Sequence, residues 1–360
     1  MMENAAIFSS AEKTSKEVGS CDVSVAMATY NGDKYISEQL DSIARQSILP
    51  AELVITDDGS SDRTIEIVER FASTAPFPVR LFRNEQRLGY ANNFLKATSL
   101  CSEKLIAFCD QDDVWLEDKL KTCLGAFEDP EVLLCVHSGE LWSGTNRTET
   151  YNPRFQARRV FVPLSAYPIQ TYPGFAMVIR EKVLEITDNH RRPGFAAGEQ
   201  MGHDQWVWFL AAIFGEIVVL PDILCLYRQH GNNLFGGTAR NVRRTASLAI
   251  RPRSYQDISR IEVHFAEFLQ QITPQSSASL RPRAEAAARS LSRRAHLNAL
   301  RAQLYAKESN AFQRLGAFGG ILMHGGYLPG RESARIGTRA ALKDFVFGVP
   351  GIHKRLWGSS

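Results

Sequence analysis

Acidic side chains gather directly after apolar runs of strand length in the first third of the chain. An Asp-Asp pair at 57–58 follows ELVIT, and the quartet Asp-Gln-Asp-Asp at 110–113 follows LIAFC. Ligands of open α/β sheets bind outside the carboxyl ends of the strands, so both acidic segments are expected on one rim. Converging carboxylates repel one another unless a cation lies among them, and oxygen ligands suit Mg²⁺ or Mn²⁺. The spacing therefore predicts a divalent-cation site that also takes substrate phosphates.

Each acidic segment also has an alternative explanation as plain structure. The residues DDGSSD at 57–62 have the composition of a turn and a helix cap, and for this segment alone both interpretations stay open. Three carboxylates directly after an apolar strand are harder to explain as a turn. The presence of both segments at one edge favours a functional site.

The elements that must position this rim alternate in the manner of βαβ units. Between the strand-length runs, apolar residues recur three and four apart, as Ile36, Leu40 and Ile43 do, which is typical of one face of a helix. The strand-length runs themselves recur every 25–30 residues, at 23–28, 52–56, 79–82, 105–109 and 132–136. This pattern favours a largely parallel sheet that helices cover on both faces.

The pattern changes after residue 140. Residues 140–172 are polar and contain several Arg and Pro, which fits either a flexible loop or a pair of edge strands. Beyond them we expect strands at 175–179 and 217–220, and helices at 204–214, 254–272 and 282–315.

The net charge of +3 is the sum of two unlike parts. Residues 1–235 hold 22 Lys and Arg against 32 Asp and Glu, whereas residues 236–360 hold 20 against 7. Such asymmetry indicates segments with different partners. We expect a disordered lead-in at 1–20, which lacks the apolar core of a secretory signal, then an α/β domain at 21–235 and a basic, mainly helical region at 236–360.

The six cysteines form no CxxC pair and show no metal-ligand spacing with histidine. Several lie in apolar runs, where a reduced cysteine behaves as a small hydrophobic residue. No run approaches the roughly 18 apolar residues that a spanning helix needs. The sequence therefore predicts a cytoplasmic protein with reduced thiols and no structural zinc, and it leaves open a peripheral position on the inner face of the membrane.

Four motifs, in this order along the chain, resemble the signature of family 2 glycosyltransferases. They are VSVAMATYNG at 23–32, TDDGSSDRT at 56–64, RLGYANNF at 87–94 and FCDQDDVWLEDKL at 108–120. The segment GHDQWVWFLAAIFGEIVVLPDILCLYRQHGNN, at 202–233, is similar to the acceptor-side part of bacterial members, including rhamnosyltransferases. The resemblance implies a GT-A fold, with a nucleotide-binding mixed sheet flanked by helices.

The resemblance also implies roles for individual residues on the donor side. Tyr30 corresponds to the residue that stacks on the donor base, and Asp58 to one that hydrogen-bonds a uracil- or thymine-type base. The metal ligands, for Mn²⁺ or Mg²⁺, correspond to Asp112, Asp113 and His230. The whole set of donor-binding positions is Thr29, Tyr30, Asn31, Asp58, Asn92, Asn93, Asp110, Asp112, Arg228 and His230.

On the acceptor side, Asp204 corresponds to the general base of the family. Its position at the start of a predicted helix favours the anion, although a first-turn aspartate is also common as plain structure. Gly174, His203 and Trp206 correspond to positions near the acceptor, and Trp206 has the alternative of a core residue. His230 likewise has a purely structural alternative.

The activity implied is inverting transfer of a sugar, from a dTDP-rhamnose or UDP-hexose type of donor, to a hydroxyl of a glycan or lipid-linked acceptor in polysaccharide biosynthesis. A cation would offset the charge of the leaving diphosphate, and a base would take the proton of the hydroxyl. A sugar nucleotidyltransferase and an inactive nucleotide-sugar-binding homologue remain as alternatives. A dinucleotide-binding oxidoreductase and a P-loop ATPase are disfavoured, because GxGxxG and GxxxxGK[ST] are absent.

The basic region 236–360 has three possible partners. It lacks a nucleic-acid-binding signature, so no nucleic acid is expected. Clusters such as RNVRR and RSLSRR fit an anionic membrane surface, and the apolar, Gly-interrupted segment at 318–330 is too short to span one. A solvated helical bundle that docks on the acidic domain is the other interpretation.

Overall fold

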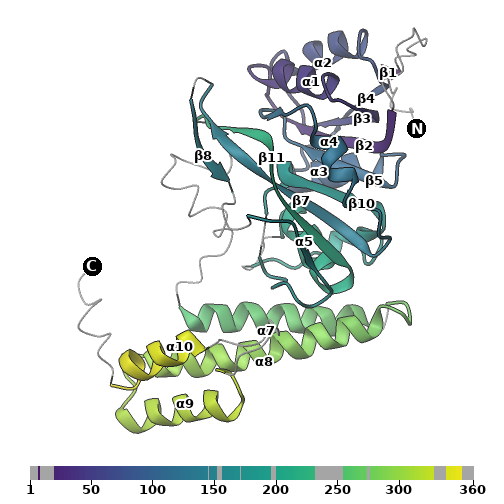
Figure 1. Cartoon of the computed structure of the whole chain (residues 1–360). Helices are drawn as coiled ribbons and strands as arrows, with labels where there is room; N and C mark the ends of the chain where they lie inside the picture. The colour runs from purple at the N-terminus through teal and green to yellow at the C-terminus, as the bar shows by residue number, and fades with distance from the viewer. Residues whose placement is uncertain are drawn as a thin grey trace. The chain divides into compact units, whose positions relative to one another are not determined.

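The structure is a computed structural model of the whole chain, and it describes residues 7–8, 20–144, 146–151, 156–170, 172–195, 200–231, 254–273, 276–327 and 338–350. The chain divides into two compact units (Figure 1). The first comprises 1–162, 168–192 and 200–249, and the second comprises 163–167, 193–199 and 250–360. The expected lead-in at 1–20 lies almost wholly outside the described residues.

The first unit is built on one mixed sheet, with strand order β1-β4-β3-β2-β5-β10-β7-β11-β6. Two further strands extend it, because β8 pairs with β7 and β9 pairs with β11. The strands are β1 (Ile7–Phe8), β2 (Ser20–Thr29), β3 (Leu49–Asp57), β4 (Val79–Arg83), β5 (Leu105–Cys109), β6 (Val114–Trp115), β7 (Val132–Trp142), β8 (Arg147–Tyr151), β9 (Arg159–Phe161), β10 (Met177–Arg180) and β11 (Glu216–Arg228).

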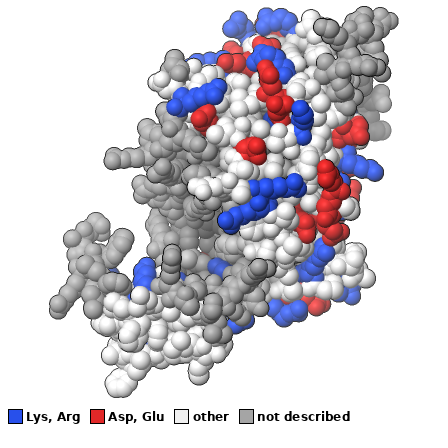
Figure 2. Space-filling model, in the orientation of Figure 1, with Lys and Arg blue, Asp and Glu red and all other residues white. Residues whose placement is uncertain are grey.

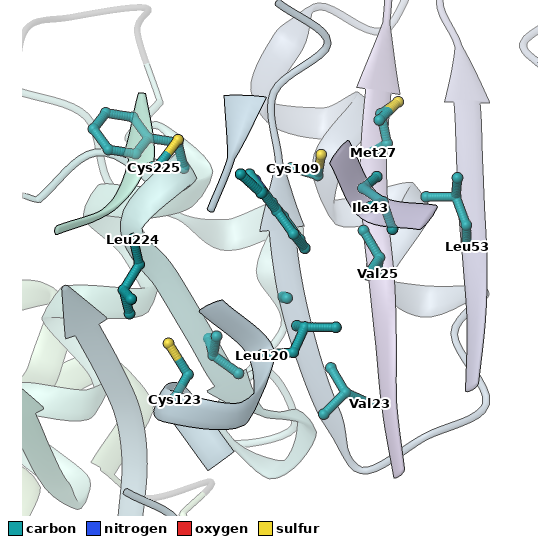
Figure 3. Packing of buried hydrophobic residues seen from close by; sticks show 14 of the residues in the cluster. Val23, Val25, Met27, Ile43, Leu53, Cys109, Leu120, Cys123, Leu224 and Cys225 are labelled. Carbon is teal, nitrogen blue, oxygen red and sulfur yellow. The ribbon is translucent and has the colours of Figure 1, made fainter. Parts of the chain in front are cut away.

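Successive side chains of β2 point to opposite faces of the sheet, which divides the core into two layers. Val23, Val25 and Met27 of β2 join a buried cluster that also includes Ile43 and Leu120 from helices of one face (Figure 3). The helices of the first unit are α1 (Ile36–Ala44), α2 (Thr64–Ala72), α3 (Tyr90–Ser99), α4 (Lys119–Leu124) and α5 (His203–Phe214). Helices α1, α2 and α4 supply that cluster, whereas α3 packs on β2 and β3 and also against α5. The sheet is therefore buried on both faces, as the sequence predicts.

The expectation of a largely parallel sheet is only partly correct. Strands β4, β3, β2 and β5 are parallel neighbours, and β7 is parallel to β11. However, β10 lies antiparallel between β5 and β7, so the two parallel groups are joined through an inverted strand. The sheet is therefore mixed, which confirms the fold class that the family resemblance implies. Within 140–172, β8 and β9 are edge strands, but each pairs with a long strand rather than with the other.

The second unit is helical. Its described helices are α7 (Tyr255–Ile272), α8 (Arg281–Tyr305), α9 (Ala311–Met323), α10 (Thr338–Lys343) and a π-helical turn at Asp344–Gly348. The single helix expected at 282–315 is wrong, because α8 ends at Tyr305 and a new helix begins at Ala311. The Asn310 side chain accepts a hydrogen bond from the backbone N–H of Gln313, and the Gln313 side chain accepts one from the backbone N–H of Asn310, which fixes the new start.

Two buried carboxylates hold the helices of the second unit together. Glu262 is fully buried and accepts hydrogen bonds from Arg294 at 2.8 Å and Asn298 at 2.8 Å. Asp344 is also fully buried and accepts from Arg301 at 2.9 Å, with the hydroxyls of Tyr305 and Tyr327 each at 2.8 Å. Charges buried this deeply persist only when paired and hydrogen-bonded. Glu262 and Asp344, two of the few acidic residues of 236–360, are therefore paired with arginine inside the unit.

Candidate functional site

The ends of β2 and β3 are tied together by their last residues. The Thr29 hydroxyl donates to a carboxylate oxygen of Asp57 at 2.8 Å, and the Asp58 N–H donates to the Thr29 carbonyl at 2.9 Å. Asp57 also accepts the N–H of Ser60 at 2.8 Å, which closes the turn after β3. Asp57 thus follows the structural alternative, and together with Thr29 it shapes this edge of the sheet.

Asp58 lies almost fully buried beneath the loop that leads into α3. Its carboxylate accepts the N–H groups of Leu88 at 2.6 Å and Gly89 at 2.8 Å, and the side-chain amide of Asn84 at 3.0 Å. Gly89 has a φ of 78°, a left-handed conformation that favours glycine. Asn93, which is also buried, donates to the Thr56 carbonyl at 2.9 Å. Asp58 and Asn93 therefore anchor the 84–89 loop and α3 to the strand ends.

Because Asp58 accepts three hydrogen bonds at a buried position, we expect Asp58→Asn to lower the free energy of unfolding by about 2–4 kcal/mol. An asparagine side chain would place its NH₂ group, a donor, against loop N–H groups that also donate. The loop should therefore become less ordered, and the affinity for the nucleotide should fall as a result. Urea unfolding and nucleotide titration measure the two effects. Asp22→Asn, at an exposed carboxylate of β2, is the matched control. An unfolding midpoint unchanged from the parent protein would contradict this role for Asp58.

Tyr30 offers an exposed aromatic face at the end of β2. It is 37% exposed, and the guanidinium of Arg87 lies 3.9 Å from its ring centroid. The side chain of Gln111 accepts the Tyr30 N–H at 3.0 Å and donates to the Tyr30 carbonyl at 3.1 Å, so the acidic loop after β5 is fastened to this turn. Asn31, with a φ of 47°, accepts the N–H of Ser61 at 2.8 Å. An aromatic ring held this way can stack on a planar base.

Asp112 and His230 lie 118 residues apart in the sequence and meet in the structure. A carboxylate oxygen of Asp112 lies 2.8 Å from Nε2 of His230, and the imidazole stacks on Tyr35 with ring centroids 4.5 Å apart. Arg228 donates to the Asp112 carbonyl at 2.7 Å and forms an ion pair with Glu38. Arg228 is only 7% exposed, so the structure uses it to fix the Asp112 loop against α1 and β11.

Asp113 faces inward. It is fully buried, one oxygen accepts the Arg228 N–H at 2.9 Å, and the other has no hydrogen-bond partner among the described residues. Burial, aided by the charges of Asp112 and Asp110, raises the pKa of Asp113 well above its usual range. The fully buried Lys119 supplies a positive charge nearby, and its Nζ donates to the Phe175 carbonyl at 2.7 Å.

The geometry therefore favours Asp112 and His230, rather than Asp113, as residues that could hold a divalent cation. A carboxylate oxygen suits both Mn²⁺ and Mg²⁺, whereas an imidazole nitrogen favours the transition metal Mn²⁺ over Mg²⁺, which usually keeps waters and substrate phosphates as further ligands. In the part of the chain that the structure describes, no group of three or more His, Cys, Asp and Glu is arranged as a metal site.

Asp204 lies in the first turn of α5, opposite the acidic loop. Its carboxylate accepts the N–H of Gln205 at 2.8 Å, and the side chain of Gln205 accepts the Gly202 N–H at 3.0 Å. Burial, followed by the negative charges of Asp112 and Asp204, raises the pKa of Asp110 to about 7. The charge of Asp204, on the predicted acceptor side, therefore acts on the Asp110 carboxyl at the end of β5.

His203, beside Asp204, is packed among aromatic rings. Its imidazole stacks on Phe94 at a centroid distance of 4.0 Å and meets Phe108 edge-on at 4.9 Å. A Cβ on Gly174 would lie 2.5 Å from the His203 Nε2, so only glycine fits there. Neither ring nitrogen has a hydrogen-bond partner among the described residues. Burial, with the nearby charge of Arg192, lowers the pKa of His203 to about 3.

A neutral buried histidine makes stability depend on pH. Burial also lowers the pKa of His137 to about 3. In the unfolded chain a histidine takes a proton below about pH 6.5, so each of the two should cost about 1.4 kcal/mol of stability per pH unit as the pH falls below that value. Urea unfolding between pH 7.5 and 5.0 measures the slope. His203→Gln should lower this slope by the contribution of one proton, about 1.4 kcal/mol per pH unit. His264→Gln, at an exposed histidine, should leave the slope unchanged. Equal slopes for the two variants would contradict the burial argument.

Trp206 follows its structural alternative, because it is fully buried and its indole N–H donates to the Asn189 side chain at 2.7 Å. Sequence reasoning missed Arg192, which is 4% exposed. Its guanidinium donates to the Met201 carbonyl at 3.1 Å and to the side chain of Asn92 at 2.6 Å. Arg192 thus links the donor-side helix α3 to the turn that carries Asp204. Nothing in the sequence distinguishes it from other arginines.

Comparison with known families assigns the domain. Residues 24–187 match the sequence profile of glycosyl transferase family 2. These residues are a family 2 glycosyltransferase domain. An uncharacterized glycosyltransferase of Nostoc sp. is 28% identical over 219 residues, 59% of this chain and 66% of the relative. The dTDP-rhamnosyl transferase RfbG of Shigella flexneri is 38% identical over 102 residues, 27% of this chain and 35% of the relative.

Solved structures agree on the fold. TarS of S. aureus, crystallised with UDP-GlcNAc, has a TM-score of 0.53 at 17% identity and covers 92% of this chain and 91% of that chain. Identity this low shows the fold alone, which is of the GT-A type. The chain spans about two thirds of the length of the Nostoc relative. No helix among the described residues of the family 2 domain or the helical unit is long and apolar enough to cross a membrane.

Proposed function

We propose that the chain is an inverting glycosyltransferase, which moves a sugar from a dTDP-rhamnose or UDP-hexose type of donor to a hydroxyl of a glycan or lipid-linked acceptor. The tie between the exposed Tyr30 and the acidic loop through Gln111, with Asp112 of that loop 2.8 Å from His230, carries the proposal. The similarity of a 102-residue segment to a dTDP-rhamnosyl transferase supports a dTDP-rhamnose type of donor.

The residues divide the chemistry in a simple way. The ring of Tyr30 would stack on the base, and the loop that Asp58 anchors would border the nucleotide. Asp112 and His230 would hold Mn²⁺ or Mg²⁺, which when bound offsets the charge of the diphosphate. Asp204 would accept the proton of the acceptor hydroxyl as that oxygen attacks the anomeric carbon, and the bond to the diphosphate breaks in the same displacement. No covalent enzyme intermediate is involved.

A panel of nucleotide sugars, each with Mn²⁺ or Mg²⁺, tests the proposal. We expect one donor to raise the melting temperature and to undergo slow hydrolysis, with release of the nucleoside diphosphate. Binding without hydrolysis or transfer would instead indicate an inactive homologue. Formation of a nucleotide sugar from a sugar phosphate and a nucleoside triphosphate would indicate a nucleotidyltransferase.

We further propose that residues 236–360 contact an anionic membrane surface on the cytoplasmic side.

A further inference from the structure

Helix α9 is apolar on both of its faces. Its sequence, AFQRLGAFGGILM, has Arg314 as its one charged residue, and that side chain is 4% exposed and donates to the Ala306 carbonyl at 3.0 Å. Ala317 and Ile321 are buried on the inner face. A Cβ on Gly320 would lie 3.2 Å from the Leu300 side chain, which shows how closely α9 approaches α8. A helix that is apolar all round is normally buried all round.

The other face of α9 is exposed. We define the α9 outer face as Phe312, Leu315, Leu322 and Met323, which are 87%, 56%, 52% and 84% exposed. They recur along the helix at the spacing of one face, and a Cβ at Gly316 or Gly319, between them, would meet nothing within 4 Å.

The apolar surface continues beyond α9. The ring of Phe318 lies 5.6 Å from the ring of Phe345, which is 56% exposed, and Leu342 on α10 is 67% exposed. Singly scattered apolar residues need no explanation, but a contiguous patch of this kind marks an interaction surface.

The region of the chain that carries this surface is basic in composition. Residues 236–360 hold 20 Lys and Arg against 7 Asp and Glu, and two of those acids, Glu262 and Asp344, are fully buried in ion pairs with arginine. At the C-terminal end of α9 the exposed Arg293 donates to the His324 carbonyl at 2.7 Å, and the exposed Lys343 follows Leu342. In Figure 2 the surface over α9 is white, without acidic side chains on the face shown.

We propose that the α9 outer face inserts into the surface of an anionic lipid bilayer. Lipid offers acyl chains to the apolar side chains and negative headgroups to the surrounding Arg and Lys, whereas a second copy would bring the same positive charge. At 13 residues α9 is about 20 Å long, so it lies in the plane of the interface. The inference deepens the proposed membrane contact of residues 236–360 and rests on it, whereas it is independent of the proposed sugar transfer.

Vesicle co-sedimentation of the full chain tests the insertion. We expect binding to vesicles of phosphatidylcholine with phosphatidylglycerol, weaker binding at high salt and little binding to pure phosphatidylcholine. The double variant Phe312→Ser/Met323→Ser should bind about tenfold or more weakly, because two large apolar side chains no longer enter the bilayer. Val263→Ser, at a 42% exposed valine of α7 in the same unit, is the matched control and should bind as the parent does.

Three outcomes would overturn the proposal. They are equal binding by the double variant and the parent, no binding of the parent to anionic vesicles, and a concentration-dependent oligomer in sedimentation velocity that the double variant abolishes. Phe312→Trp with brominated lipid gives a second readout, since fluorescence quenching reports insertion directly. Donor hydrolysis without vesicles is measured in parallel, so a failure of lipid binding and a failure of glycosyl transfer are distinguished.

Discussion

Replacing Asp204 by asparagine is expected to lower the rate of sugar transfer by about 10²–10⁴-fold and to leave nucleotide binding nearly unchanged. The acceptor hydroxyl has a very high pKa, so its attack requires a positioned base. Asp204, the proposed base, lies in the first turn of α5, where its carboxylate accepts the Gln205 N–H at 2.8 Å. The position near a helix N-terminus stabilises the anion, which is the form that accepts a proton.

Asparagine keeps the shape and the hydrogen bond of Asp204 but cannot accept the proton, so the loss should appear in kcat rather than in donor affinity. Asp41→Asn, at an exposed carboxylate of α1, is the matched control. Transfer by Asp204→Asn at the parent rate would contradict the assignment. A loss of transfer that accompanies an equal loss of nucleotide affinity would indicate a structural role instead.

Strand positions could be predicted from the sequence, whereas strand direction could not. The run at 175–179 is an apolar strand-length segment like those before it, and the structure indeed places β10 at Met177–Arg180. Its antiparallel pairing with β5 and β7 depends on the path of the preceding chain, which leaves no trace in the alternation of a short buried strand.

The prediction of helix boundaries from the sequence was less accurate where two local patterns conflict. The segment 282–315 is rich in good helix formers, and these outweighed the local pattern at Asn310 and Gln313 that starts a new helix. The two side chains satisfy backbone donors only where the preceding helix has already ended. Packing of α9 back against α8, which the sequence does not encode locally, makes that break favourable.

The sequence does not show which charged residues of the site are buried, so their individual roles could not be predicted from it. Asp112 and Asp113 are neighbours in one acidic motif, yet only Asp112 reaches His230, while Asp113 turns inward to the backbone of Arg228. Lys119 and Arg192 are nearly or fully buried, although these residue types are almost always exposed. Spacing and composition identify a rim of carboxylates, but the tertiary partners decide which of them face the ligand.

Removal of divalent cations is expected to reduce transfer by about 10²-fold or more, because a bound cation would offset the charge that develops on the departing diphosphate. Asp112→Ala should have the same effect with cation present, since it removes the carboxylate that lies 2.8 Å from His230. Isothermal titration of nucleoside diphosphate, with and without Mn²⁺, should show that the variant loses the cation-dependent part of its affinity.

Two further variants sharpen this test. Asp118→Ala, at an exposed carboxylate just before α4, should keep the full response to Mn²⁺. Asp113→Asn should also keep it, because the Asp113 carboxylate faces the Arg228 N–H at 2.9 Å and its raised pKa already favours a neutral side chain. If Asp113→Asn loses the response as Asp112→Ala does, Asp113 must turn outward to ligate the cation. Transfer that survives both exhaustive chelation and Asp112→Ala would show that no metal is required.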